Sequence, residues 1–120
     1  MTRWEIIETT EYLGWFQGLA EGQRDDVEER LEKLREWGPA LTRPYADHIK
    51  GSSYSNLKEL RIASGGQLRI LFIFDPMRRA VLLIGGDKST DSEWNKWYRR
   101  MIPLAETYYR KYLETMKEQR

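Results

Sequence analysis

Residues 56–75, NLKELRIASGGQLRILFIFD, decide the fold of this chain of 120 residues. Two apolar runs flank residues 64–66, Ser-Gly-Gly, which are typical turn formers. The segment therefore predicts two antiparallel strands joined by a tight turn. Each strand carries an arginine in its middle, Arg61 and Arg69, at a position where a sheet ordinarily has a β-branched or apolar side chain.

The length of the turn determines where the two arginines lie. A three-residue turn places Arg61 directly across from Arg69, whereas a two-residue turn sends one of them into the core, so we choose the first register. One face of the hairpin is then entirely apolar and the other is mixed. The apolar face holds Leu60, Ile62, Leu68, Ile70, Phe72 and Phe74, and the mixed face holds Glu59, Arg61, Arg69, Leu71, Ile73 and Asp75.

Two like charges that face each other across a sheet are destabilising, so something must offset them. One interpretation is internal, because Glu59 and Asp75 share the face and can form an ion-pair network. The other is a bound anion, because guanidinium groups present a fork of donors that matches phosphate. Lys58 flanks the cluster and Lys88 follows the next strand. The residues alone leave both interpretations open.

The remaining chain predicts an α+β fold in a single domain, residues 1–120, with the order β-α-α-β-β-β-α. We expect two layers, with an antiparallel sheet of about four strands, two N-terminal helices on one face and a C-terminal helix. Pro103 should kink the C-terminal helix or open a second one. The predicted strands are 4–8, 57–62, 67–74 and 79–85, the helices are 11–19 (ended by Gly22), 24–37 and 91–117, and the loops are 41–55 and 85–90.

Composition excludes several classes of protein and site. The chain has no cysteine, which excludes disulfides and thiolate metal sites, and no His, Asp and Glu cluster has ligand spacing, so we expect neither metal nor cofactor. The only histidine, His48, is expected at the surface. The longest apolar run, residues 70–74, is too short to span a membrane, and the charged N-terminus is unlike a signal peptide, so we expect a cytoplasmic protein.

Charge is distributed unevenly along the chain. Residues 1–36 hold 5 basic and 10 acidic side chains, and residues 37–120 hold 15 basic and 9 acidic ones. This asymmetry is typical either of a polyanion partner for the second part or simply of solvated helix faces that differ in charge.

The pattern LKELR (57–61), GQLRILF (66–72), AVLLI (80–84) and DK (87–88) resembles the RelE/HigB superfamily of bacterial toxins, in its phage-derived HigB-like branch. The resemblance covers roughly residues 3–113. It implies a small RelE-like fold whose concave sheet face binds mRNA in the ribosomal A site. It also implies mRNA cleavage without a metal, by attack of a ribose 2′-hydroxyl on the adjacent phosphate.

The resemblance also implies roles for particular residues. Arg61 and Arg69 would be catalytic, stabilising the phosphorane, and Lys88 would add positive charge or move a proton. Glu59 and Asp87 are candidate bases, and no general acid–base pair is identified. RNA contacts are expected from Lys58, Glu59, Asp87, Trp94 and Tyr98. The family often has other residue types at the positions of Lys58 and Trp94, and Tyr98 is the substitute for a family tyrosine.

The function implied is the toxin of a type II toxin–antitoxin system, a ribosome-dependent mRNA endoribonuclease. Its partners would be the ribosome, mRNA and a HigA-like helix-turn-helix antitoxin. The alternative is a non-catalytic RNA- or protein-binding member of the same fold, either a ParE-like inhibitor or a phage accessory protein, because fold alone does not determine chemistry.

Overall fold

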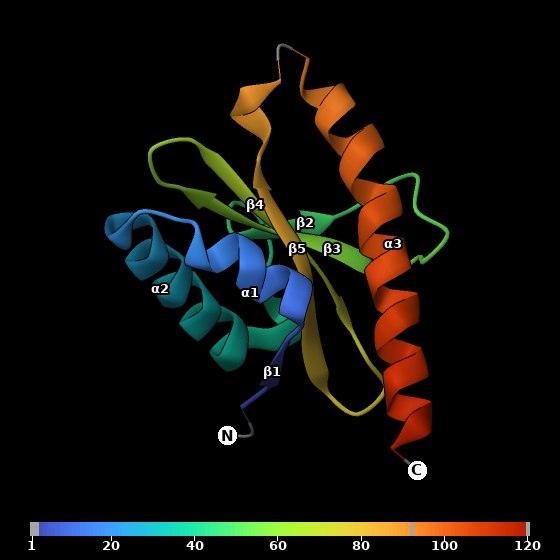
Figure 1. The fold of residues 1–120 in the computed structure, drawn as a ribbon. Helices are drawn as coiled ribbons and strands as arrows, with labels where there is room; N and C mark the ends of the chain where they lie inside the picture. Colours follow the sequence, from blue (N-terminus) through green and yellow to red (C-terminus); the bar gives the residue numbers. More distant parts are fainter. Residues whose placement is uncertain (1–2, 92, 120) are drawn as a thin grey trace.

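The computed structural model describes residues 3–91 and 93–119, apart from the side chain of Trp94. Its elements follow the order β-α-α-β-β-β-β-α, with two short 3-10 turns, as Figure 1 shows. They are β1 (Glu5–Glu8), α1 (Thr10–Gln17), α2 (Glu21–Trp37), η1 (Gly38–Ala40), β2 (Ala46–His48), β3 (Leu57–Ala63), β4 (Gln67–Phe74), β5 (Arg79–Asp87), η2 (Lys88–Thr90) and α3 (Trp94–Glu118).

The described residues form one five-stranded sheet with the order β1-β5-β4-β3-β2. β1 is parallel to β5, and the other neighbours are antiparallel. The sheet has one strand more than predicted, since residues 46–48 lie within the segment expected to be a loop. Three residues are too few to produce a periodic pattern, and β2 exists because it pairs with the edge of β3.

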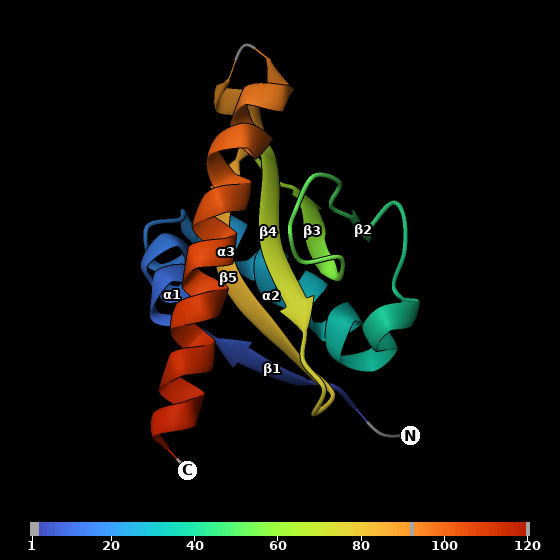
Figure 2. The same cartoon turned by 90° about the vertical axis from the view of Figure 1, so that its right-hand side faces the viewer.

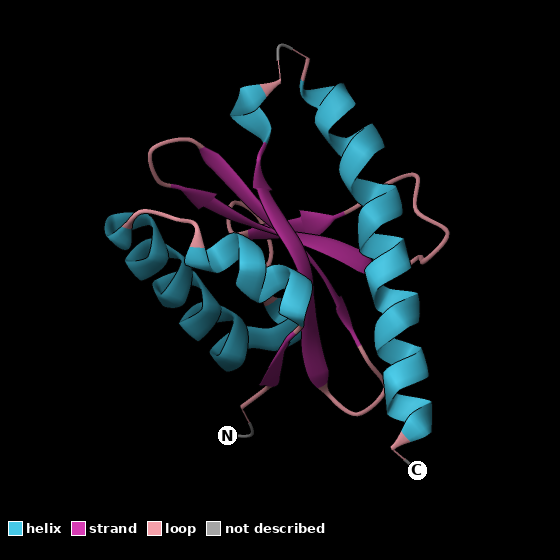
Figure 3. Cartoon of the chain, viewed as in Figure 1, coloured by secondary structure: helices cyan, strands magenta, loops and turns pink. Residues whose placement is uncertain are grey.

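Helices cover both faces of the sheet, so the predicted two-layer arrangement is wrong. α1 and α2 pack on the face that carries Leu60, Ile70 and Phe72, as predicted for the apolar side of the hairpin. α3 packs on the opposite face, against Leu71 and Ile73. In Figure 2 α3 is nearest to the viewer, the strands lie behind it, and α1 and α2 lie behind the strands; Figure 3 shows the same three layers by element type.

The C-terminal helix α3 continues through Pro103, so one helix is found and no second helix opens there. Pro103 is exposed, and the opposite side of α3 packs on the sheet. The buried residues on that side recur every four positions: Trp97, Met101, Ala105 and Tyr109. Their burial outweighs the loss of one backbone hydrogen bond at the proline, which the sequence pattern alone cannot weigh.

Gly85 and Gly86 belong to β5, which runs two residues beyond its predicted end, and not to a loop. A Cβ atom on Gly85 would lie 2.3 Å from the Trp15 ring, and one on Gly86 would lie 3.0 Å from the Trp97 indole. The two glycines therefore let indole rings approach the strand from both faces of the sheet.

Gly22 was also predicted as a helix break, but it lies in the first turn of α2. The helix α1 ends earlier, at Gln17, with Gly18 as its C-cap, and α2 begins at Glu21. The two helices are therefore separated by a short connection centred on Leu19, three residues before the expected break.

Candidate functional site

Arg61 and Arg69 are directly paired across β3 and β4, which confirms the predicted register. The turn has three residues, because Ala63 pairs with Gln67, and Gly65 adopts a φ of 61°, which glycine tolerates best. The helix α2 holds this turn, since Gln23 Nε2 donates a hydrogen bond to the Ser64 carbonyl at 2.8 Å. The pair thus lies on rigid strands.

Glu59 lies between the two guanidinium groups and is only 2% exposed. Its Oε2 is 2.9 Å from Arg61 Nε and 3.3 Å from Arg69 Nε. The first contact is a hydrogen bond, whereas Arg69 Nε donates no hydrogen bond and is held by charge alone. Glu59 therefore offsets the repulsion between the arginines, as the internal interpretation predicted.

Asp47 on β2 is a second acidic partner, which the sequence analysis missed. Its Oδ2 is 3.2 Å from Arg61 Nη2 and 2.7 Å from Arg43 Nη2. The hydrogen bond from Arg43 and the nearby Arg61 charge hold the pKa of Asp47 below its ordinary value. Asp47 comes from a strand too short to be recognised in the sequence, so no local signal connects it to Arg61.

Asp75, the other predicted partner, is not in this cluster. It pairs with Arg79 at 2.7 Å, at the far end of the β4–β5 hairpin. Arg69 also donates two hydrogen bonds locally, from Nη1 to the Leu68 carbonyl at 2.9 Å and from Nη2 to Gln67 Oε1 at 3.3 Å.

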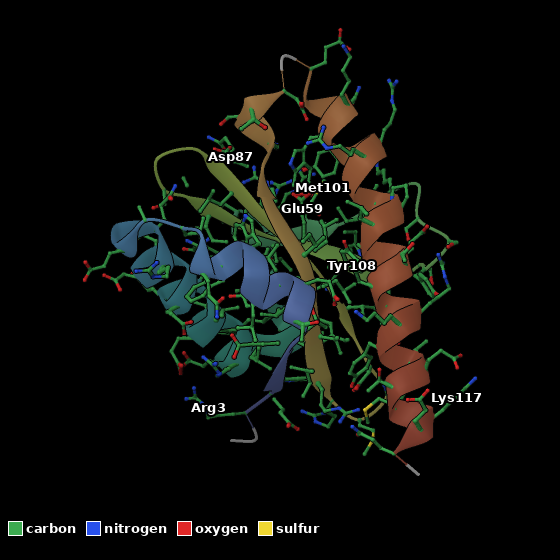
Figure 4. The ribbon with its side chains drawn as sticks, viewed as in Figure 1. Arg3, Glu59, Asp87, Met101, Tyr108 and Lys117 are labelled. Carbon is green, nitrogen blue, oxygen red and sulfur yellow. The ribbon has the colours of Figure 1, made fainter. Side chains whose placement is uncertain are left out.

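Lys88 and Tyr98 complete the cluster. The Tyr98 hydroxyl donates to Glu59 Oε1 at 2.5 Å. Burial and this hydrogen bond raise the pKa of Tyr98 to about 12, so its hydroxyl stays protonated at neutral pH. The Lys88 ammonium lies 5.8 Å from the centre of the Tyr98 ring, and burial together with the Arg69 and Arg61 charges lowers its pKa. In Figure 4 Glu59 lies in the space between the strands and the N-terminal half of α3.

The cluster carries more positive than negative charge. Arg43, Arg61, Arg69 and Lys88 are four cations, and they meet three carboxylates, those of Asp47, Glu59 and Asp87, the last of which is near enough to Arg69 for that charge to lower its pKa. The internal network therefore exists but leaves a formal surplus of one positive charge. An anion is the chemical group that such a surplus binds.

Both arginines also line an open depression of about 270 Å³ at the edge of the sheet. A third arginine, Arg30 of α2, reaches this depression and donates a hydrogen bond to the Arg61 carbonyl, and its guanidinium lies 4.7 Å from the Tyr45 ring. No acidic side chain of the described residues lines the depression. Arg30 was not predicted as a site residue, because no spacing within the chain connects the helix that carries it to the arginine pair.

The other predicted site residues lie apart from the arginine pair or are otherwise engaged. Lys58 lies on the opposite face of β3, where its ammonium is 5.4 Å from the Phe74 ring. The Asp87 carboxylate accepts hydrogen bonds from the Gln67 and Ser89 backbone amides. Burial acts to raise the pKa of Asp87, but these bonds outweigh it and lower the pKa. Lys58 therefore flanks the core beneath α1 and α2, and Asp87 is the N-cap of η2.

Two further predictions concern Trp94 and His48. The side chain of Trp94 lies outside the described part of the chain, although its backbone begins α3. His48 is exposed at the end of β2, as expected.

Within residues 3–91 and 93–119, no group of three or more metal-ligating side chains is placed to hold a metal ion. None of the helices in the same ranges combines the length and the apolar composition that crossing a bilayer requires.

Comparison with protein families gives one match over most of the chain. The family described as phage derived protein Gp49-like (DUF891) matches residues 14–110. The chain belongs to this Gp49-like family. Two Mycobacterium tuberculosis proteins named as toxins are similar to it. HigB3 is 44% identical over 77% of this chain and 78% of its own length. HigB2 is 38% identical over 87% of this chain but only 52% of its own length.

Solved structures show that the Gp49-like chain has the RelE fold. The isolated Escherichia coli RelE toxin aligns with a TM-score of 0.60 at 12% identity, covering 82% of this chain and 98% of RelE. RelE in the intact E. coli RelBE toxin–antitoxin complex aligns with a TM-score of 0.57 at 10% identity, over 70% of this chain and 95% of that one. Together with the Gp49-like family match and the similarity to HigB3 and HigB2, this fold confirms the resemblance to the RelE/HigB superfamily.

Proposed function

We propose that this Gp49-like protein is the toxin of a type II toxin–antitoxin system and that it cleaves mRNA on the ribosome without a metal. The names of HigB3 and HigB2 support the toxin assignment. The single observation that carries the nuclease assignment is the Arg61–Arg69 pair, held in register on two strands with a surplus of positive charge. Fixed cations of this kind stabilise charge that develops on a phosphate during reaction.

The reaction would be an internal transfer within RNA. The ribose 2′-oxygen forms a bond to the adjacent phosphorus, and the bond from phosphorus to the 5′-oxygen breaks, which leaves a 2′,3′-cyclic phosphate and a 5′-hydroxyl. Arg61 and Arg69 would neutralise the non-bridging oxygens of the phosphorane. Both are charged at any relevant pH, so they act as electrostatic groups and not as proton carriers.

Proton transfer would use Tyr98, Glu59 and Lys88. A standing phenolate is excluded by the raised pKa of Tyr98. Its hydroxyl, 2.5 Å from Glu59 Oε1, can instead pass its proton to that carboxylate while it accepts one from the 2′-hydroxyl. Lys88, whose pKa is lowered, would give a proton to the departing 5′-oxygen. In this proposal Tyr98 with Glu59 is the base and Lys88 is the acid, the pair that the sequence left unidentified.

The test is controlled expression in a bacterial host, with growth followed and mRNA 5′ ends mapped. We expect growth arrest and new 5′ ends inside translated messages for the wild type, and neither for Arg61→Ala/Arg69→Ala. The matched control is Arg100→Ala/Arg110→Ala, which removes the same charge from exposed positions on α3 and should remain toxic. Circular dichroism of the purified variants establishes that they are folded.

A second candidate function is favoured by the ion pairs that Asp47 and Glu59 form with Arg61. Arg61 contacts both Glu59 and Asp47, and such a network also suits a non-catalytic binder of RNA or of a protein target. Growth arrest with intact messages would overturn the nuclease proposal in favour of this one.

A HigA-like antitoxin is the partner that the proposal implies. Coexpression with the product of the neighbouring gene should restore growth and yield a complex that copurifies with this chain. Continued arrest despite expression of that product would contradict the pairing.

A further inference from the structure

A groove separate from the arginine depression lies between α3 and the loop that joins β2 to β3. Its volume is about 390 Å³, within the range of about 300–1,000 Å³ that holds small ligands. The side chains that matter for its chemistry are those of Lys50, Asn95, Tyr98, Arg99, Ile102 and Glu106.

Hydrogen bonds clamp the wall of this groove in place. Glu106 Oε2 on α3 accepts from the Ser52 hydroxyl at 2.7 Å, from the Ser53 amide at 2.7 Å and from the Ser53 hydroxyl at 2.8 Å. These bonds fix the loop against α3, so the groove is formed before anything binds. They also direct the one carboxylate of the groove, among the described residues, towards the loop, where its charge is solvated by three donors.

The two cations of the groove differ from Glu106 in their contacts with the described residues. Lys50 and Arg99 are both exposed, and neither enters an ion pair or side-chain hydrogen bond among the contacts found for residues 3–91 and 93–119. Asn95 adds an amide beside them, and Ile102 adds an apolar surface. Two exposed cations beside an amide and an apolar floor are the groups that bind a nucleotide, with its phosphate on the cations and its base on the floor.

Tyr98 connects this groove to the arginine pair. Its ring lines the groove, and its hydroxyl bonds to Glu59, which contacts Arg61. A single strand whose reacting phosphate lies on Arg61 and Arg69 can therefore pass over Tyr98 and place its next nucleotide between the loop and α3.

We propose that the groove of Lys50 and Arg99 is a subsite for the RNA nucleotide that flanks the cleaved phosphate. The inference rests on the proposed function, because it assumes RNA at the arginine pair. It adds a recognition site that makes binding depend on phosphates other than the one that reacts.

The test uses two fluorescent 2′-O-methyl RNA hexanucleotides, which cannot be cleaved because the nucleophile is blocked. One has all its phosphates charged, and the other carries neutral methylphosphonates everywhere except at the central linkage. Affinities are measured by anisotropy for four proteins: the wild type, Lys50→Ala/Arg99→Ala, Arg61→Ala/Arg69→Ala and the charge-matched control Arg110→Ala/Lys117→Ala, whose positions are exposed on the C-terminal half of α3.

We expect Lys50→Ala/Arg99→Ala to bind the fully charged RNA about tenfold more weakly than the wild type, with a salt slope smaller by about 0.7 for one lost phosphate contact on a single strand. The same variant should bind the flank-neutral RNA as the wild type does. The control variant should match the wild type on both.

Two results would overturn the inference in distinguishable ways. If Arg61→Ala/Arg69→Ala loses binding while Lys50→Ala/Arg99→Ala behaves like the control, the groove is not a subsite and the proposed function stands. If Arg61→Ala/Arg69→Ala binds as the wild type does, RNA does not occupy the arginine pair, and both the function and the subsite fail.

Discussion

At the scale of single residues, the charge on Glu59 explains how two arginines can face each other across a sheet. One nearly inaccessible carboxylate contacts both guanidinium groups and also accepts a hydrogen bond from Tyr98. Removing one charged or hydrogen-bonding group from this buried cluster leaves its partners without compensation. The resulting loss in the free energy of unfolding is larger than the net stabilisation that the interaction provides.

The substitution Tyr98→Phe removes the hydroxyl and keeps the ring, so it distinguishes the role of the hydroxyl from that of the ring. We expect a loss of about 1–2 kcal/mol in the free energy of unfolding, because a buried charged acceptor loses one donor. We also expect loss of RNA cleavage with RNA binding retained, because the phenyl ring still lines the groove. Urea unfolding and 5′-end mapping measure the two effects. Full cleavage by Tyr98→Phe would show that the hydroxyl carries no proton in the reaction.

Much of the residue-level site could be predicted, because alternation along a strand is a strong constraint. The turn length alone placed Arg61 opposite Arg69 with Glu59 beside them. The same alternation sends Lys58 to the other face of β3, away from the arginine pair, and the sequence already contains that information. Asp47 and Arg30 reach the arginines through space from other elements, and no spacing within the chain reveals that contact.

At the scale of elements, the glycines of β5 set the distance between the sheet and the helices. A methyl group on Gly85 would overlap with the Trp15 ring. That ring packs against the core beneath α1 and α2. β5 therefore cannot carry a side chain there without displacing α1.

Gly85→Ala should destabilise the protein by about 1–3 kcal/mol, which is the usual cost of overpacking. The matched control is Gly14→Ala in α1, where a new methyl group meets no atom within 4 Å and helix propensity favours alanine. This control should be neutral or stabilise by up to about 1 kcal/mol. Equal unfolding midpoints for the two variants in urea would contradict the close approach of Trp15.

The clamp between α3 and the β2–β3 loop predicts a dependence of stability on pH. Hydrogen bonds from Ser52 and Ser53 hold the pKa of Glu106 below its ordinary value of 4.5. Since the native pKa is the lower one, the stabilisation is complete above the unfolded value and is lost as the pH falls through the native value. The free energy of unfolding should therefore fall less steeply below pH 4.5 in Glu106→Gln than in the wild type. Parallel curves for the two proteins would exclude this linkage.

The elements themselves were largely predictable where they are long and periodic. β3, β4 and α2 follow the apolar pattern closely. β2 was missed because three residues show no period. Whether Pro103 kinks α3 or opens a second helix stayed open in the sequence, because the proline is a local signal whereas the packing of the opposite side of the helix is tertiary.

At the scale of the whole molecule, two cores share one sheet. On β4, Ile70 belongs to the core beneath α1 and α2, while its neighbour Leu71 belongs to the core beneath α3. Adjacent residues of the same strand thus serve different cores, so neither core can be lost while the strand that serves the other remains intact.

The two cores should therefore unfold together. Labelling with 5-fluorotryptophan gives a ¹⁹F resonance for each of the five tryptophans. The resonances of Trp15 in the first core and Trp97 in the second, assigned through Trp15→Phe and Trp97→Phe, should lose native intensity at the same urea concentration. Separate midpoints would mean that the layers are independent cooperative units.

The order of the strands also determines how readily each strand around the arginine pair opens. β4 has a neighbour on both sides, whereas β2 is a three-residue edge strand held by β3 alone. Local opening should expose β2 amides to hydrogen exchange long before those of β4. Each such opening detaches Asp47 from Arg61 while Glu59 and Arg69 stay in place, so Arg61 then keeps one carboxylate partner, Glu59, among the described residues, and can take a phosphate where Asp47 had been.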